Sequence, residues 1–584
     1  MSSRKNQPAG HKKDGIHFVN ARPASETEKL KTQRLVRAHV GKWISDQTRD
    51  RSTAPGSSSH SAKSEPSSYS LVSRPRQLPA IKHVLARDPR FHPSPSHASD
   101  SSDSSDDFAE PTELAAETPR HEFLPIEAPV SGVLDPFSTY PSHFPLELVH
   151  PCESHLLTVV WPGVAPLPEG ETAGHSWFPL ARSDPALFTA FMFASLCHQR
   201  VQWVNQWNPR TVFGPKQQSF LQLCEMEAIK LINKAVRDPV RVNSDAVLLS
   251  VICMAHHRTE EAGTHSHLRT PFNPPLQRLQ WLDVYGCLRP NMIHIQGLVQ
   301  MIIMRGGLKN IKTGSLPPTI SLWVIPKTSH GLPKDLTDYV SYSSDIVTCS
   351  CFCVRPVFEF WPLDENHMGL SIQDILGFGP SDIDRGFGRL HYIGITPEMA
   401  EALQAALTYI KVVKSKLGTT YTVTTLADQR NITQHTLLSL PPASAIESTF
   451  TNPTHAATYE ACRLATLIFS VSVIFPMPAQ NNPLQRLAHQ IQFVLCQPNA
   501  FALWSAPHTR VPLLWILMLG GIAAYGTPDR AWFGSALHDT TRRSGLSSWP
   551  IVKRALESML WYGAACDEAA ESLWIEAHRA YPVG

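Results

Sequence analysis

Three cysteines stand close enough together to be considered as metal ligands. Cys349, Cys351 and Cys353 occupy alternate positions of the sequence CSCFC. Their thiols would converge on one ion only if the segment were extended, and structural zinc sites usually combine C-x-x-C pairs. Free cysteine also behaves as a small buried apolar residue. We therefore interpret the triplet as structural and predict no zinc here.

A second group of metal-ligand types lies in the sequence HHRTEEAGTHSHLRTP. It consists of His256, His257, Glu260, Glu261, His265 and His267. Imidazole and carboxylate groups of this kind bind divalent metals. The same stretch carries Gly, Thr, Ser and Pro, which are typical of an exposed loop after a helix. We favour a solvated connection and predict neither metal nor cofactor. His294, on an otherwise apolar stretch, is interpreted as a core or boundary histidine.

Motifs for common catalytic chemistry are missing from the sequence. It has no phosphate-binding G-x-x-x-x-G-K-[ST] loop, no G-x-S-x-G nucleophile turn and no H-E-x-x-H helix. The glycine pairs at 377/379 and 386/388 lack the third glycine of a dinucleotide site. We predict that the protein is not an enzyme. A helical enzyme or small-molecule receptor, with a pocket among the helices, is kept as the alternative.

The elements that would position any site are predicted to be helices. Apolar residues recur at helical spacing through most of the sequence after residue 184. Start signals stand at Asp184-Pro185, Ser244, Asn291 and Thr396-Pro397, and stop signals at Gly306-Gly307 and Gly418. Only TYTVTTL at 420–426 indicates a short strand. We therefore predict an all-α fold, a large multi-helical domain. The most apolar run, Val511 to Tyr525, is about fifteen residues, shorter than the roughly 20 that span a bilayer, and is interpreted as a buried helix.

Composition divides the 584 residues into a tail and a folded part. Residues 51–110 contain 17 Ser and 7 Pro, too polar to bury a core. All eleven cysteines and most apolar runs lie after residue 151. We predict that residues 1–130 are mostly disordered and that 134–584 are folded. Met1 to Lys13 lacks the apolar stretch of a signal peptide, so a reducing, intracellular compartment is expected.

The tail contains one predicted helix, at about residues 26–47. Ser25 and Glu28 form a capping-box pattern, and apolar residues follow at helical spacing. Residues 1–51 hold twelve Lys or Arg against five Asp or Glu. Such a basic helix suits nucleic acid, an acidic membrane surface or an acidic protein, or it docks on the folded part. The residues considered for weak, non-specific nucleic-acid contact or nuclear import are Arg4, Lys5, Lys12, Lys13, Lys29, Lys31, Arg34, Arg37 and Lys42.

The tail ends in an acidic segment, at residues 99–127. It has nine carboxylates and one Arg, with Phe108 and Leu114 among them. This composition is typical of a disordered activation segment and also of a solubilising linker.

Several motifs resemble one known family. TYEACRLATLIFSV at 458–471, PLLWILMLGGIAA at 512–524, RAWF at 530–533 and VKRALESMLW at 552–561 resemble the C-terminal helices of the fungal-specific transcription factor domain. Further likenesses lie at 134–141, 182–195, 294–308 and 573–574. The leader at 17–40 is similar to members often labelled tachykinin-family proteins.

The resemblance implies an all-helical regulatory domain, a nuclear location and a role in transcription through protein contacts or an effector pocket. Protein partners are expected, a homodimer or heterodimer is left open, and no membrane is expected. Many relatives carry a zinc cluster with six cysteines, whereas this sequence has no Cys before Cys152, so direct base-specific DNA binding is not predicted. Residues 312–344 depart from the family pattern, with a Pro- and Gly-bearing stretch where a helix is expected. We predict an insertion or a retained intron there.

Overall fold

The computed structural model describes residues 140–165, 173–204, 213–256, 270–288, 291–323, 346–356, 359–416, 422–500, 503 and 505–580. All of them belong to one compact unit of the chain. The predicted tail (1–130), its basic helix and its acidic segment lie outside these residues.

Helices account for the regular structure, and no strand occurs in the part of the chain that the structure describes. The N-terminal helices are α2 (Leu146–His155), α3 (Trp161–Val164), α4 (Ala173–Ser183), α5 (Pro185–Val204), α6 (Pro215–Arg237), α7 (Asp245–His256), α8 (Leu282–Tyr285), α9 (Met292–Met304) and α10 (Leu316–Trp323). The C-terminal helices are α12 (Ile346–Phe352), α13 (Ile372–Leu376), α14 (Pro380–Arg385), α15 (Pro397–Lys416), α16 (Val423–Ser439), α17 (Pro453–Phe469), α18 (Leu484–Leu495), α20 (Arg510–Ala523), α21 (Asp529–Arg543), α22 (Trp549–Glu557) and α23 (Gly563–Ala580). The predicted all-α fold is confirmed.

Short turns of other helix types connect or extend these elements. Two are π-helices, η2 (Leu156–Val160) and η10 (Ser470–Ile474). The 3-10 turns are η4 (Leu279–Trp281), η5 (Leu308–Asn310), η6 (Glu365–His367), η7 (Phe387–Ile393), η8 (Ala443–Ala445), η9 (Glu447–Thr449), η11 (Pro498–Ala500) and η12 (Pro507–Thr509).

The predicted start signals, and the stop signal at Gly306-Gly307, lie where expected, whereas Gly418 lies outside the described residues. The carboxylate of Asp184 accepts the amides of Ala186 at 2.8 Å and Leu187 at 3.2 Å, which satisfies free donors at the start of α5. Gly306 and Gly307 follow α9 with φ of 83° and 99°, a backbone region that glycine enters without steric cost. These local signals therefore fix the beginning of α5 and the end of α9.

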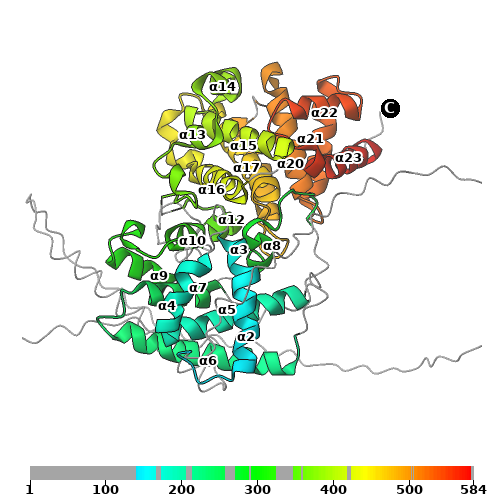
Figure 1. Cartoon of the computed structure of the whole chain (residues 1–584). Coiled ribbons are helices and arrows are strands. Elements are labelled where there is room, and N and C mark those ends of the chain that lie inside the picture. Colours follow the sequence, from blue (N-terminus) through cyan, green and yellow to red (C-terminus); the bar gives the residue numbers. More distant parts are fainter. Residues whose placement is uncertain are drawn as a thin grey trace, which may run out of the picture. The chain divides into compact units, whose positions relative to one another are not determined.

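Helix α5 is buried on nearly all sides. It packs against α6 and α7, and α7 in turn packs against α9 (Figure 1). Its residues from Ala186 to His198 are all buried, as expected for a helix that is apolar around its whole circumference. The N-terminal helices thus share a core with α5 at its centre.

The C-terminal helices are arranged around α17 and α20. Helix α17 packs against α18 and α20, and α20 packs against α21 and α23 (Figure 1). Trp515 on α20 is fully buried, and its indole Nε1 donates to the carbonyl of Leu560 at 2.8 Å. A Cβ at Gly520 would lie 2.5 Å from the Phe533 ring, and one at Gly521 would lie 2.4 Å from Leu573. The two glycines therefore permit the close approach of α21 and α23.

Two expectations about local structure are wrong. Residues 423–426 belong to helix α16 rather than to a strand, because helix contacts override the β-branched sequence. Leu316–Trp323 forms helix α10 inside the stretch 312–344, where we expected no helix, and residues 324–345 lie outside the described part. That residues 312–344 are an insertion or a retained intron stays a prediction. Val511–Tyr525 is confirmed as a buried helix, because α20 is buried from Pro512 to Ala523. Among the described residues, the helix that is long and apolar enough to cross a membrane is Pro453–Ile474, and 89% of its apolar window is buried in the protein.

Candidate functional site

The residues singled out from the sequence do not come together in one site. The nine basic candidates from Arg4 to Lys42 lie outside the described residues, as do His257, Glu260, Glu261, His265 and His267. His256 ends α7. His294 is buried, with Nδ1 at 2.9 Å from the carbonyl of Met254, which confirms it as a core histidine. Cys349 and Cys351 lie on helix α12 and Cys353 just after it, so the triplet is not on an extended segment.

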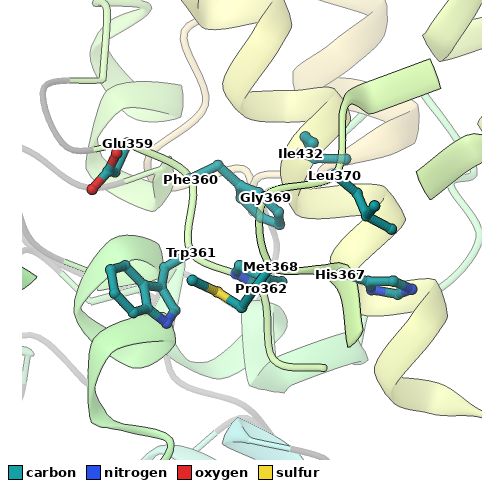
Figure 2. A pocket seen from close by; sticks show the side chains of 9 residues that line it. All are labelled: Glu359, Phe360, Trp361, Pro362, His367, Met368, Gly369, Leu370 and Ile432. Atoms are coloured by element: carbon teal, nitrogen blue, oxygen red, sulfur yellow. The ribbon is translucent and has the colours of Figure 1, made fainter. Parts of the chain in front are cut away.

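A pocket of about 330 Å³ lies beside α16; we call it the Trp361 pocket. Figure 2 shows the residues that line it: Glu359, Phe360, Trp361, Pro362, His367, Met368, Gly369, Leu370 and Ile432. Eight of them come from the chain segment 359–370, and Ile432 comes from α16. Most of the side chains are aromatic or aliphatic, although polar atoms make up a large part of the cavity surface.

One carboxylate on α16 holds the segment that forms this pocket. Asp428 accepts the backbone amide of Leu363 at 2.7 Å and that of Asp364 at 3.0 Å. It also bonds Nδ1 of His367 at 2.9 Å. Leu363 and Asp364 lie between the two parts of the segment that line the pocket, residues 359–362 and 367–370, and His367 begins the second part. Asp428 therefore fixes the loop from which both parts extend.

Asp428 is structural rather than catalytic in this arrangement. Its side chain is only 1% exposed, and both carboxylate oxygens accept hydrogen bonds. Burial raises the pKa of Asp428, whereas the two amides and His367 oppose that rise. A carboxylate whose oxygens are occupied by the fold is poorly placed to take a proton from a substrate.

Other polar side chains of α16 bind elements on other sides of the helix. Gln429 donates through Nε2 to the carbonyl of Ile375 at 2.9 Å. Gln434 donates to the hydroxyl of Ser350 at 2.8 Å and accepts a hydrogen bond from Ser470. Helix α16 thus connects α13, α12 and η10 through hydrogen bonds, although it lies in the interior.

The most unusual of these residues is Arg430, which is fully buried. Its Nη1 donates to the carbonyl of Leu279 at 2.8 Å, and its Nη2 to Oε1 of Gln280 at 2.6 Å. The guanidinium lies 4.7 Å from the centre of the Phe475 ring. Burial lowers the pKa of Arg430 to about 10, so the side chain stays charged at neutral pH. The partners of the guanidinium, Leu279, Gln280 and Phe475, are all neutral, and no ion pair to Arg430 occurs among the described residues.

Arg430 binds a strained segment of the N-terminal helices. Gln280 and Trp281 adopt φ of 57° and 53°, a left-handed conformation that costs non-glycine residues free energy. Gln280 also donates to the carbonyl of Val164 at 3.3 Å, and Trp281 donates to that of Val160 at 3.1 Å. The hydrogen bonds of this segment therefore join α16 to the region around α3.

The recognisable α17 sequence YEACRLATLIF contains one buried ion pair. Arg463 bonds Glu460 through Nη2 at 2.6 Å and Nε at 3.0 Å, with 11% and 18% of the two side chains exposed. Glu460 also accepts the amide of Ala443 at 2.9 Å. The carboxylate of Glu460 is therefore the partner of the Arg463 guanidinium.

The reactive side-chain types in the core are held in unreactive forms. All eleven cysteines are free, and burial raises the pKa of Cys152 and of Cys462 to about 12, so these are thiols at neutral pH. Burial lowers the pKa of His155 to about 4, which keeps that imidazole neutral. Within the described residues, no group of three or more His, Cys, Asp or Glu could hold a metal ion.

Sequence reasoning missed the Trp361 pocket and the polar residues of α16. The signal for α16 was the run DQRNITQ, which lies between Leu426 and Leu437 in a stretch with helix-compatible residues. Four consecutive polar residues, 428–431, point in different directions around a helix. A solvated helix and a buried hydrogen-bonded one give the same pattern, so the sequence alone does not separate them.

Comparison with known proteins identifies one family. Residues 382–561, from α14 to just beyond α22, match the family model of the fungal specific transcription factor domain. The resemblance is thus confirmed over this region of the chain. No curated protein and no solved structure matches the chain.

Proposed function

We propose that this protein regulates transcription through contacts with other proteins. The observation that carries the proposal is the match of residues 382–561 to the fungal specific transcription factor domain. That family points to a regulator rather than an enzyme. The packing of the matched residues supports the same view, because α16, α17 and α20 use their polar groups to hold other elements of the fold.

The tail supplies a second line of support. Its acidic segment, 99–127, has the composition of an activation segment, and its basic residues suit nuclear import. We therefore propose a nuclear location. Tagged full-length protein should concentrate in the nucleus, and deletion of residues 1–50 should abolish that concentration. An unchanged distribution after the deletion would contradict the proposed import role.

The regulatory role can be tested by tethering. The full chain would be fused to an unrelated DNA-binding domain upstream of a reporter gene. We expect reporter expression to change relative to that DNA-binding domain alone, and to change less when residues 99–127 are deleted. A control deletion of residues 61–90, from the Ser- and Pro-rich part of the tail, should leave the effect in place. Equal expression from all fusions would contradict the proposal.

Contact with nucleic acid is proposed to be weak and independent of sequence. It would come from Arg34, Arg37, Lys42 and their neighbours on the predicted tail helix binding phosphates. Affinity should fall steeply as salt rises, because bound phosphates release their counterions. A tight, sequence-selective and salt-insensitive complex would overturn this view.

The Trp361 pocket favours a second candidate function, that of an effector receptor. Its volume of about 330 Å³ lies at the lower end of the range for small-molecule sites, roughly 300–1,000 Å³. The aromatic and aliphatic side chains of the lining, and the occupation of both Asp428 oxygens by hydrogen bonds, support binding rather than catalysis. In this view the helical domain changes its protein contacts when the pocket is filled.

A further inference from the structure

We propose that the Trp361 pocket binds a small aromatic cation, of the arylalkylammonium class. This inference rests on the second proposal above, the effector pocket, and names the chemistry of its ligand.

The aromatic part of the ligand follows from the lining. Phe360 and Trp361 contribute rings, and Met368 and Leu370 line the same cavity although they are 44% and 45% exposed. A soluble ligand with an apolar ring would cover these side chains and remove apolar area from water. The volume of about 330 Å³ limits the ligand to one or two rings with a short substituent.

The positive charge follows from the groups around the cavity. Glu359 lines it, and Asp428 binds His367, another lining residue, at 2.9 Å. The loop that Asp428 holds carries two more acids, Asp364 and Glu365, and neither Lys nor Arg lines the cavity. The faces of the two aromatic rings are also electron-rich and attract cations. An anion of the same size would meet repulsion from Glu359.

Three compounds with the same ring system and different charge test this proposal. Purified full-length protein would be titrated calorimetrically with tryptamine, indole and indole-3-acetate. We expect tryptamine to bind tightest, by about threefold or more over indole, which is the range of exposed cation–π contacts. Indole-3-acetate should bind weakest of the three.

Two variants assign the contributions of ring and charge. Trp361→Ala should weaken tryptamine and indole alike, by about tenfold or more, because the aromatic wall is lost. Glu359→Gln should weaken tryptamine alone and leave indole unchanged. Glu447→Gln, which neutralises an exposed carboxylate away from the pocket, is the matched control and should change neither. Thermal melts verify that each variant is folded. If Trp361→Ala does not fold, Leu370→Trp, at an exposed position of the lining, should block binding instead.

The outcomes separate this inference from the regulatory proposal. Absence of binding by all three compounds at millimolar concentration, tightest binding of indole-3-acetate, or binding unaffected by Trp361→Ala and Leu370→Trp would overturn the aromatic-cation site. If reporter expression in the tethering experiment still changes, only the ligand inference falls. If tryptamine binds as expected while every tethered fusion is inactive, the regulatory proposal falls and the binding site stands.

Discussion

Helices α16 and α20 lie in the same domain and are both largely buried, yet they contribute in opposite ways. From Pro512 to Ala523, α20 buries residues that are almost entirely apolar, and its glycines allow neighbouring helices to approach closely. Helix α16 buries seven polar or charged residues, and five of these bind other elements directly: Asp428, Gln429, Arg430, Asn431 and Gln434.

Because of this difference, the two helices stabilise different features of the fold. Apolar contacts are non-directional, so α20 stabilises the packing of helices without defining where a loop must lie. Hydrogen bonds are directional, and breaking one leaves a buried group unsatisfied. Helix α16 can therefore hold irregular segments, the loop at 359–370 and the strained turn at Gln280, in single conformations.

The largest expected effect is on Arg430. Arg430→Ala should lower the free energy of unfolding by about 3–5 kcal/mol, because it leaves a cavity and leaves the carbonyl of Leu279 without its donor. Arg430→Met keeps most of the volume and should cost less. Denaturant unfolding of the two variants measures the difference. A loss below about 1 kcal/mol for Arg430→Ala would mean that the buried polar contacts of α16 stabilise little.

A truncation in α20 provides the apolar counterpart. Leu517 is fully buried, and Leu517→Ala should cost about 2–5 kcal/mol through lost burial and a residual cavity. The loss should not depend on pH, because no titratable group is involved. Urea unfolding at several pH values checks both statements. A loss that varied strongly with pH would show that α20 is coupled to charged groups.

The ion pair of α17 should have an intermediate effect. Arg463→Leu removes both hydrogen bonds to the largely buried Glu460 and should cost about 1–3 kcal/mol. Arg385→Leu is the matched control, because Arg385 and Asp382 have the same i,i+3 spacing but are 71% and 44% exposed. It should change stability by less than about 0.5 kcal/mol. Equal melting shifts for the two variants would contradict the burial argument. A stable Arg463→Leu protein without regulatory activity would instead make this sequence a functional site.

The smallest effect concerns Asp283, next to the strained turn. Burial raises its pKa from 3.8 to about 6, so the native state keeps this proton at pH values where the unfolded chain has lost it. The contribution of Asp283 to stability is therefore greatest below pH 3.8 and is lost as the pH rises through about 6. Asp283→Asn should remove this dependence, which amounts to about 1–2 kcal/mol between mildly acidic and neutral pH. Melting temperatures across that range test it, and parallel curves for wild type and variant would contradict the assignment.

The sequence predicts the apolar helices better than the polar one. Helix α20 follows from its unbroken apolar run, and α5 from its Asp184-Pro185 start, because burial and capping are local signals. Helix α16 has polar residues on every side, and its β-branched start at 423–425 indicates a strand. The Trp361 pocket depends on Asp428 reaching a loop more than sixty residues earlier in the sequence. Such a contact has no local signature, so the structure was needed to find it.

Hydrogen exchange at two amides tests most directly whether polar groups of α16 position the pocket loop. The amides of Leu363 and Asp364 donate to Asp428. In the wild-type protein both should exchange slowly, and Asp428→Asn should accelerate them while the amides of α20 keep their rates. Fast exchange of both amides in the wild type, or unchanged rates in Asp428→Asn, would contradict the account.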